Sequence, residues 1–153
     1  MRQGLLLLAC GLIALSDASA SSDIAPERER TLTHALYALG VKYRYGGASL
    51  EEGFDCSGLV THVNERAWGI ALPRVVDEQR HIGKAVRLKE LVPGDLVFYN
   101  TRNRPYSHVG IYLGEGRFVH APRSGAHVRV ESVETRYWRA RFNGGRRLEP
   151  PAF

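Results

Sequence analysis

The spacing of apolar residues changes along this chain from a helical period to a strand period. In the first half, apolar residues recur at three- and four-residue steps. They predict a helix over 56–68, ended by Gly69, whose apolar side carries Leu59, Val60, Val63 and Ala67. A second such segment starts at Pro26 and stops at Gly40, with an apolar side made of Leu32, Ala35, Leu36 and Leu39.

From residue 95 onward, short segments rich in β-branched and aromatic residues alternate with turn residues. They are DLVFYN from Asp95, SHVGIYL from Ser107, RFVHA from Arg117, HVRVES from His127 and YWRARF from Tyr137. Helices followed by such a run are typical of an α+β fold, so we expect N-terminal helices packed on an antiparallel β-sheet of about five strands. At 153 residues the chain has the length of one domain.

The first twenty residues have the pattern of a secretory signal. Arg2 gives a positive start, an apolar run extends from Leu5 to Leu15, and ASA at 18–20 is a small-x-small cleavage site. The run is too short for a membrane-spanning helix. We therefore expect residues 1–20 to be a signal peptide and 21–30 a polar lead-in, and the protein to be exported to the periplasm or cell envelope.

Cys10 supports a second interpretation of the same segment. Within LLAC, from Leu7, it would be acylated as in a lipoprotein, and the protein would then associate with a membrane. If Cys10 instead leaves with the signal, Cys56 is the single cysteine of the exported chain and forms no internal disulfide. A lone thiol in an oxidising compartment is either reactive or buried.

The net charge of +5 is spread along the chain, which favours a solvated basic surface. Charge alone also suggests nucleic acid or a polymer that carries carboxylates as the partner. Export argues against nucleic acid, and we expect none.

Cys56 lies between Asp55 and Ser57 at the predicted helix start, where Asp55 suits the N-cap. Unpaired N–H groups and the helix dipole favour an anion there, which lowers the pKa of a thiol. The same N–H groups, helped by the hydroxyl of Tyr43, are placed to bind an oxyanion. The alternatives are a small buried Cys56, an Asp55 that is only a cap, and a Tyr43 that only packs.

A cysteine nucleophile also needs a base, usually His, and a group that orients the base. Of the six histidines, His108 and His120 lie on neighbouring predicted strands joined by GEG. If residues 114–116 form a three-residue loop, Gly110 faces His120, and His108 shares that side of the sheet, so the two imidazoles are diagonal neighbours. His108 would then take the thiol proton and His120 would fix its tautomer. A two-residue loop would shift the register and separate them.

Other roles for these residues are weaker. Each histidine taken alone is more typical of a surface or satisfied sheet position. A zinc site of Cys56 with two histidines lacks paired ligand spacing, so no metal and no other cofactor is expected.

Six motifs occur in order between Thr31 and Phe142, namely YRYGG, FDCSGLV, LPR, LVPGDLVFY, SHVGIYLG and FVHAP. In these motifs the chain resembles the NlpC-type cell-wall cysteine peptidases, small papain-like enzymes that cut the peptide stems of peptidoglycan. The resemblance implies a papain-like domain over 31–146, followed by a tail over 147–153. It implies a nucleophile, base and orienting group at Cys56, His108 and His120, with Tyr43 beside the thiol and the substrate peptide held by Asp55 and Ser57.

The implied activity is hydrolysis of an amide bond in stem or cross-link peptides through a thioester, by a monomer whose partners are peptidoglycan peptides. Three alternatives stay open: a papain-like acyltransferase, a secreted antibacterial amidase on the same scaffold, and a non-catalytic wall-binding module. The intact set of Cys56, His108 and His120 argues against the last.

Overall fold

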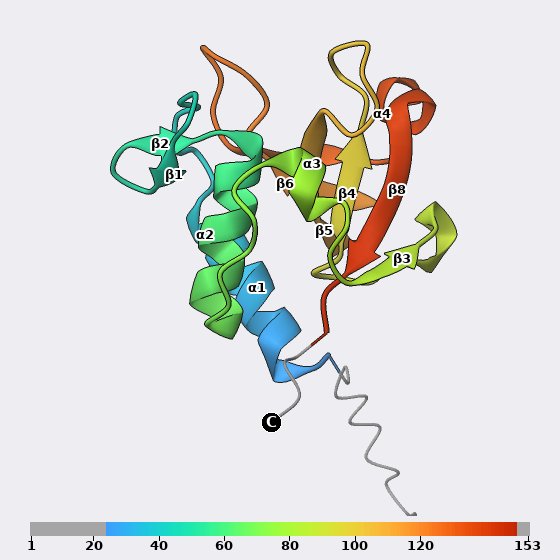
Figure 1. Ribbon diagram of the computed structural model, residues 1–153, viewed down its shortest axis with the longest axis horizontal. Coiled ribbons are helices and arrows are strands. Elements are labelled where there is room, and N and C mark those ends of the chain that lie inside the picture. The colour runs from blue at the N-terminus through green and yellow to red at the C-terminus, as the bar shows by residue number, and fades with distance from the viewer. Residues whose placement is uncertain (1–23, 150–153) are drawn as a thin grey trace, which may run out of the picture.

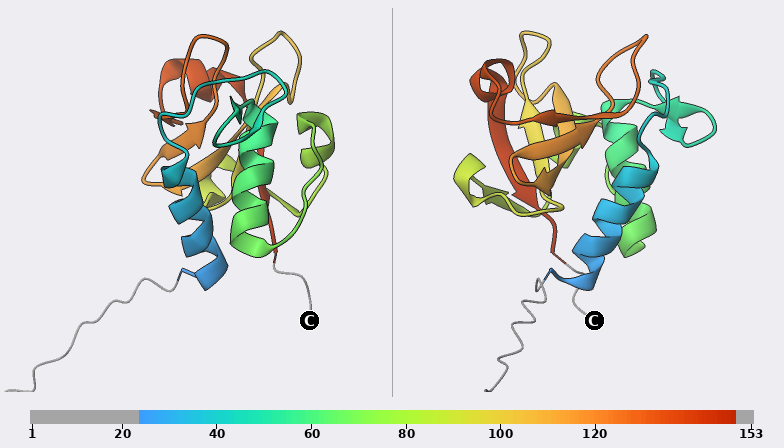
Figure 2. Two further views of the ribbon diagram at one scale, coloured as in Figure 1. Left: turned by 90° about the vertical axis from the view of Figure 1, so that its left-hand side faces the viewer. Right: turned by 180° about the vertical axis from the view of Figure 1, so that it is seen from behind.

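The strands after residue 84 form one sheet, and the two long helices pack together on one of its faces (Figures 1 and 2). The computed structural model describes residues 24–149, so the predicted signal peptide, Cys10 and the last residues of the predicted tail lie outside the described residues. The predicted α+β class is confirmed. Within residues 24–149, no helix has the length and apolar character needed to cross a membrane.

The elements follow in this order: α1 (Pro26–Tyr37), β1 (Ala48–Ser49), β2 (Gly53–Phe54), α2 (Cys56–Trp68), α3 (Val76–Gln79), β3 (Lys84–Val86), the 3-10 helix η1 (Leu88–Glu90), β4 (Leu96–Tyr99), β5 (His108–Gly114), β6 (Arg117–His120), β7 (Arg129–Ser132), α4 (Arg136–Arg141) and β8 (Phe142–Arg147). The main sheet has six antiparallel strands in the order β3-β8-β4-β5-β6-β7, and β1 and β2 form a small separate hairpin.

Helix α2 has the predicted bounds, because its two ends are chemically marked. The side chain of Asp55 accepts the N–H of Gly58 at 2.7 Å, and Gly69 ends the helix with a left-handed φ of 68°. The predicted apolar side of α1 is partly wrong: Ala35 is fully buried as predicted, whereas Leu36 and Leu39 are 51% and 40% exposed. A small residue on the inner side lets the backbone of α1 approach the core closely.

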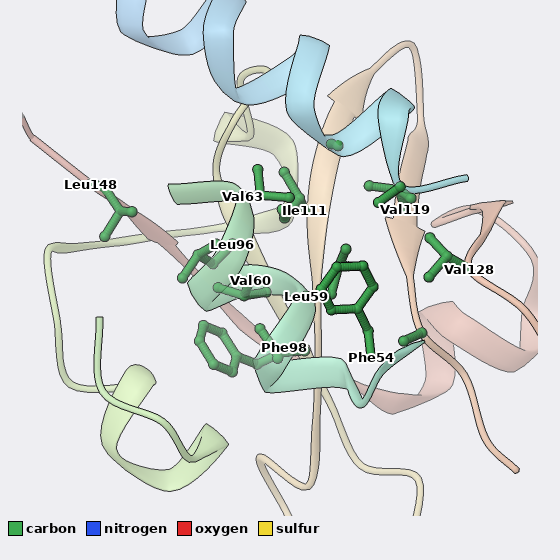
Figure 3. Packing of buried hydrophobic residues seen from close by; sticks show 14 residues of the cluster. Phe54, Leu59, Val60, Val63, Leu96, Phe98, Ile111, Val119, Val128 and Leu148 are labelled. Carbon is green, nitrogen blue, oxygen red and sulfur yellow. The ribbon is translucent and has the colours of Figure 1, made fainter. Parts of the chain in front are cut away.

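Successive side chains of the strands point alternately into two buried layers, one on each face of the sheet. Toward the helices, Leu96, Phe98, Val109, Ile111 and Val119 pack on α2, whose side of this core consists of Leu59, Val60 and Val63 (Figure 3). The residues between them face the other side, where a smaller cluster contains Val97, Tyr99, Phe118, Val133 and Trp138. The sheet is therefore covered on both faces, and the opposite face is largely aromatic.

The strand predicted over YWRARF is wrong, because Arg136–Arg141 is the short helix α4 and strand β8 starts at Phe142. Within this segment Trp138 is buried, whereas Tyr137 is 48% exposed. The short helix therefore places the Trp138 ring in the aromatic cluster and leaves Tyr137 at the surface. Strand β8 went unpredicted because its sequence, FNGGRR, is poor in β-formers. A Cβ at Gly145 would come within 2.7 Å of Val86 Cγ2, so close packing against β3 requires the glycine.

The β5–β6 hairpin differs from the prediction at its turn but keeps the predicted register at its histidines. The turn has two residues, Glu115 and Gly116, both with positive φ. A register shift between Tyr112 and Gly114 compensates for the shorter turn, so Ile111 still pairs with Val119. His108 and His120 consequently lie on one face of the sheet, as predicted.

Asp95 is a buried anchor that joins the two ends of the described chain. Its carboxylate has no exposed surface and accepts from Arg147 Nη2 at 2.8 Å, Arg28 Nη1 at 3.3 Å and the N–H of Val92 at 2.9 Å. Leu148 packs into the main core. The ordered fold thus includes the first two residues of the segment predicted as a tail.

We predict that Asp95→Asn lowers the free energy of unfolding by about 3 kcal/mol, because it leaves two guanidinium groups without their buried counter-charge. Urea denaturation of the purified domain measures this loss. The matched control is Asp77→Asn, which removes a surface partner of Arg80 that is 66% exposed and should change stability by less than about 0.5 kcal/mol. Equal losses for the two variants would contradict the anchoring role.

Candidate active site

Cys56 is the first residue of α2 and lies at the end of the molecule where the loops after β4 and β6 gather, the upper end in Figure 1. The backbone N–H of Val109 lies beside its sulfur and favours the thiolate. Val109 directly follows His108 at the start of β5. The Cys56 thiol therefore contacts the sheet at the residue next to His108.

The Asp55 carboxylate organises the segments around the thiol. Besides capping α2 it accepts the N–H of Gly46 at 3.0 Å and two bonds from Arg74, at 2.9 Å from Nη1 and 3.0 Å from Nη2. Arg74 Nη1 also donates to Ser57 Oγ at 2.9 Å. The side-chain oxygens of Asp55 and Ser57 are therefore engaged in holding the site together, and their contact with substrate stays a prediction. Sequence reasoning gave no role to Arg74, whose only signal was its place in the LPR motif.

The predicted lowering of the Cys56 pKa is wrong for this structure. Burial, which removes water from the thiolate, raises the pKa of the thiol, and the nearby Asp55 charge raises it further. The N–H groups of Val109 and Ser57 act in the opposite direction and are outweighed. Cys56 therefore rests as a neutral thiol at neutral pH.

The two predicted histidines form a buried pair. His108 Nε2 lies 2.8 Å from His120 Nδ1, and the residues are only 4% and 0% exposed. Burial, with the neighbouring His120 and Arg102, lowers the pKa of His108 to about 3. The indole of Trp138 stacks on His108 with the ring centroids 5.8 Å apart and the planes at 22°. His108 is thus a neutral imidazole held in a fixed plane.

The far side of His120 contacts a carboxylate that sequence reasoning missed. His120 Nε2 lies 2.6 Å from Glu131 Oε2 on strand β7. The strand pairing places Arg129 opposite His120, and Glu131 is two residues further on the same face. The period-two rule that related His108 to His120 was therefore also the signal that could have found Glu131.

Two cavities flank the thiol and the histidine. One, of about 560 Å³, is lined by Cys56, Tyr43 and Arg74, and the other, of about 480 Å³, by His108, Glu131 and Trp138. Arg102 lines both. Burial and the adjacent Cys56 raise the pKa of Tyr43, so its hydroxyl stays protonated beside the thiol, as its predicted position requires.

The structure brings Cys56, Ser57, Asp55 and Tyr43 together on the first cavity and His108 and His120 on the strand ends beside it. Within residues 24–149, no group of three or more His, Cys, Asp or Glu side chains has an arrangement suited to a metal ion. The arrangement supplies a thiol at the start of α2 and, at the neighbouring strand ends, two imidazoles in contact with one another.

The chain is similar to known proteins in sequence and in fold. The model of the NlpC/P60 family matches residues 40–147. The chain is 39% identical over 138 residues to a γ-DL-glutamyl hydrolase of Bacillus subtilis, an alignment that covers 90% of this chain and 32% of the relative. It is 40% identical over 119 residues to the murein DD-endopeptidase MepH of Escherichia coli, with 76% of this chain and 44% of the relative covered. The chain therefore spans less than half the length of these two relatives.

Solved structures agree with the fold. An NlpC/P60 family protein from Bacillus cereus superposes with a TM-score of 0.74 at 30% identity, covering 80% of this chain and 40% of the other. The NlpC/P60 domain of the peptidoglycan hydrolase SagA gives a TM-score of 0.69 at 30% identity, covering 79% of this chain and 98% of the other.

We predict that iodoacetamide alkylates Cys56 at pH 7 more slowly than it alkylates free cysteine. The raised pKa leaves little thiolate at neutral pH, so the rate should keep rising with pH beyond about 8.5, the pKa of an unperturbed thiol. Mass spectrometry of the labelled folded protein gives the rate at each pH. A rate that is already constant between pH 5 and 7 would instead indicate a preformed thiolate and contradict the neutral resting state.

Proposed function

The chain belongs to the NlpC/P60 family, and on that premise we propose that it is a cysteine peptidase that hydrolyses amide bonds in the stem or cross-link peptides of peptidoglycan. The single observation that best supports this proposal is the buried His108–His120 pair, 2.8 Å between nitrogens, at the strand end that adjoins the Cys56 thiol. A thiol, a base and an orienting group in series are the parts that nucleophilic acyl transfer needs.

The first half of the proposed reaction forms a thioester. Because Nε2 of His108 is occupied by His120, Nδ1 is the ring nitrogen left to take the thiol proton. The Cys56 sulfur attacks the amide carbon as that proton moves to His108. The C–N bond then breaks, and the imidazolium of His108 gives the proton to the leaving amine. Both groups start neutral, so the proton is transferred during the attack, without a preformed ion pair.

The second half releases the acyl group to water. His108 takes a proton from a water molecule, whose oxygen attacks the thioester carbon, and the C–S bond breaks. The product is a carboxylic acid, and the Cys56 thiolate recovers the proton. In both halves the oxyanion would be bound by the N–H groups at the start of α2 and by the Tyr43 hydroxyl, which lines the same cavity.

The cellular setting of the proposal rests on the N-terminal pattern. Residues 1–20 predict export to the periplasm or cell envelope, and acylation of Cys10 is the alternative that would add membrane attachment. The peptidase would act there as a monomer on peptidoglycan peptides, with Asp55 and Ser57 at the rim that holds the substrate.

We predict that Cys56→Ala abolishes release of peptides from purified sacculi and that His108→Ala lowers kcat by about 1000-fold, because the nucleophile and the base are removed. The matched control His127→Ala changes an exposed histidine outside the pair and should digest like the unaltered protein. Products are identified by mass spectrometry on a muropeptide mixture that contains both γ-DL-glutamyl and DD bonds.

Digestion by Cys56→Ala at the unaltered rate would contradict a peptidase that uses this thiol. Binding of sacculi without cleavage by any form would select a wall-binding module. Formation of a thioester that passes its acyl group to an added amine, but not to water, would select an acyltransferase.

A further inference from the structure

Glu131 closes the row of side chains that starts at Cys56. Three side-chain nitrogens converge on its carboxylate: His120 Nε2 lies 2.6 Å from Oε2, Arg129 Nε donates to Oε2 at 3.0 Å, and Trp138 Nε1 donates to Oε1 at 3.1 Å. The indole and guanidinium groups can only donate. Both carboxylate oxygens therefore accept from groups that can only donate, which favours the ionised form of Glu131. The hydrogen bond from His120 is the main reason that the pKa of Glu131 is about 2.

An ionised Glu131 determines where each histidine carries its proton. Since the carboxylate only accepts, His120 Nε2 must be protonated, and a neutral His120 then has its lone pair on Nδ1. That lone pair faces His108 Nε2 at 2.8 Å, so His108 Nε2 carries the proton. The lone pair of His108 is consequently on Nδ1, the nitrogen that the proposed reaction uses to take the thiol proton.

Bulk water cannot fix the tautomers of the two imidazoles, because His108 and His120 are only 4% and 0% exposed. Nor is Glu131 simply a surface partner of Arg129: Arg129 is 48% exposed, whereas the side chain of Glu131 is 28% exposed and bonds to a fully buried ring. The other titratable or charged groups around the histidines are Cys56 on α2, Tyr99 on β4 and Arg102 in the loop before β5. Arg123 and Tyr137 line the same cavity as His108. Within this set, Glu131 supplies the negative charge nearest to the rings.

We propose that Glu131 is a positioning residue that fixes the tautomers of His120 and His108 in series and stabilises the imidazolium that forms on His108 during acyl transfer. The proposal rests on the proposed function for its kinetic part, whereas its tautomer part concerns the resting protein alone. Trp138 contributes to the same task twice, since its ring stacks on His108 while its N–H holds the carboxylate.

The test compares Glu131→Gln with Glu131→Asp in the full chain. Glutamine keeps the size of the side chain but offers one acceptor oxygen to three donors and carries no charge. Long-range ¹H–¹⁵N correlation spectra of protein labelled at histidine report each tautomer at pH 7. We expect both His108 and His120 to be protonated on Nε2 in the unaltered protein and in Glu131→Asp, and His120 to lose this single form in Glu131→Gln.

The kinetic readout uses the release of muropeptides. Glu131→Gln should lower kcat by about 100-fold with a much smaller change in KM. Because the negative charge of Glu131 raises the pKa of His108, its removal should move the acid limb of kcat/KM to lower pH, a shift that a purely structural defect would not cause. Glu131→Asp keeps the charge and should keep the limb in place. The matched control Glu134→Gln removes an exposed carboxylate two residues past β7 and should change neither readout.

The outcomes separate the two proposals. If the unaltered protein releases no wall peptide, the proposed function fails. The measured tautomers of His108 and His120 then still test whether Glu131 fixes them. A folded Glu131→Gln with unchanged tautomers and an unchanged acid limb would overturn that role. If Glu131→Gln does not fold, the unaltered protein alone decides it, because a proton on His120 Nδ1 would overturn the proposal and a proton on Nε2 would support it.

Discussion

The carboxylate of Asp55 is the interaction on which the geometry of the site depends. This one partly exposed group caps α2, accepts the N–H of Gly46 and binds the guanidinium of Arg74 through both terminal nitrogens. These contacts join the start of α2 to the glycine-containing loop before β1 and to the segment that follows α2. Because the same contacts fix the first turn of α2, the position of Cys56 relative to the sheet follows from them.

The sheet separates packing from chemistry by its two faces. Val109 and Ile111 are buried under the helices, while their neighbours on the strand face the aromatic cluster that surrounds His108 and His120. The larger apolar core therefore lies on one face and the two histidines on the other, while the Cys56 thiol reaches the strand ends from the helix side. A Cβ at Gly110 would come within 2.8 Å of Phe118 Cδ2 and 3.2 Å of His120 Cβ, so the close approach of the two strands at the histidines requires glycine.

Sequence reasoning succeeded where a local signal sets the structure. The cap and the terminal glycine determined α2, and the period-two rule placed both histidines even though the hairpin turn differs from the one expected. It failed at α4 and β8, because one buried Trp138 and a glycine-rich strand give no periodic signal. It gave no role to Arg74, whose partners come from other elements, and it missed Glu131 because the period-two rule was not extended from His120 to the next strand. The pKa of Cys56 was predicted with the wrong direction because burial is a property of the whole fold.

The buried Asp95 draws together Arg28 in the first turns of α1 and Arg147 at the end of β8, and so it brings both ends of the described chain to the same side. Figure 1 shows this side at the bottom of the molecule and the start of α2, with its thiol, at the top. Anything joined to either end is thus attached at the pole opposite the cleft. A tether joined at residue 24 or 149 would therefore leave the end of the domain that holds Cys56 pointing away from the attachment point.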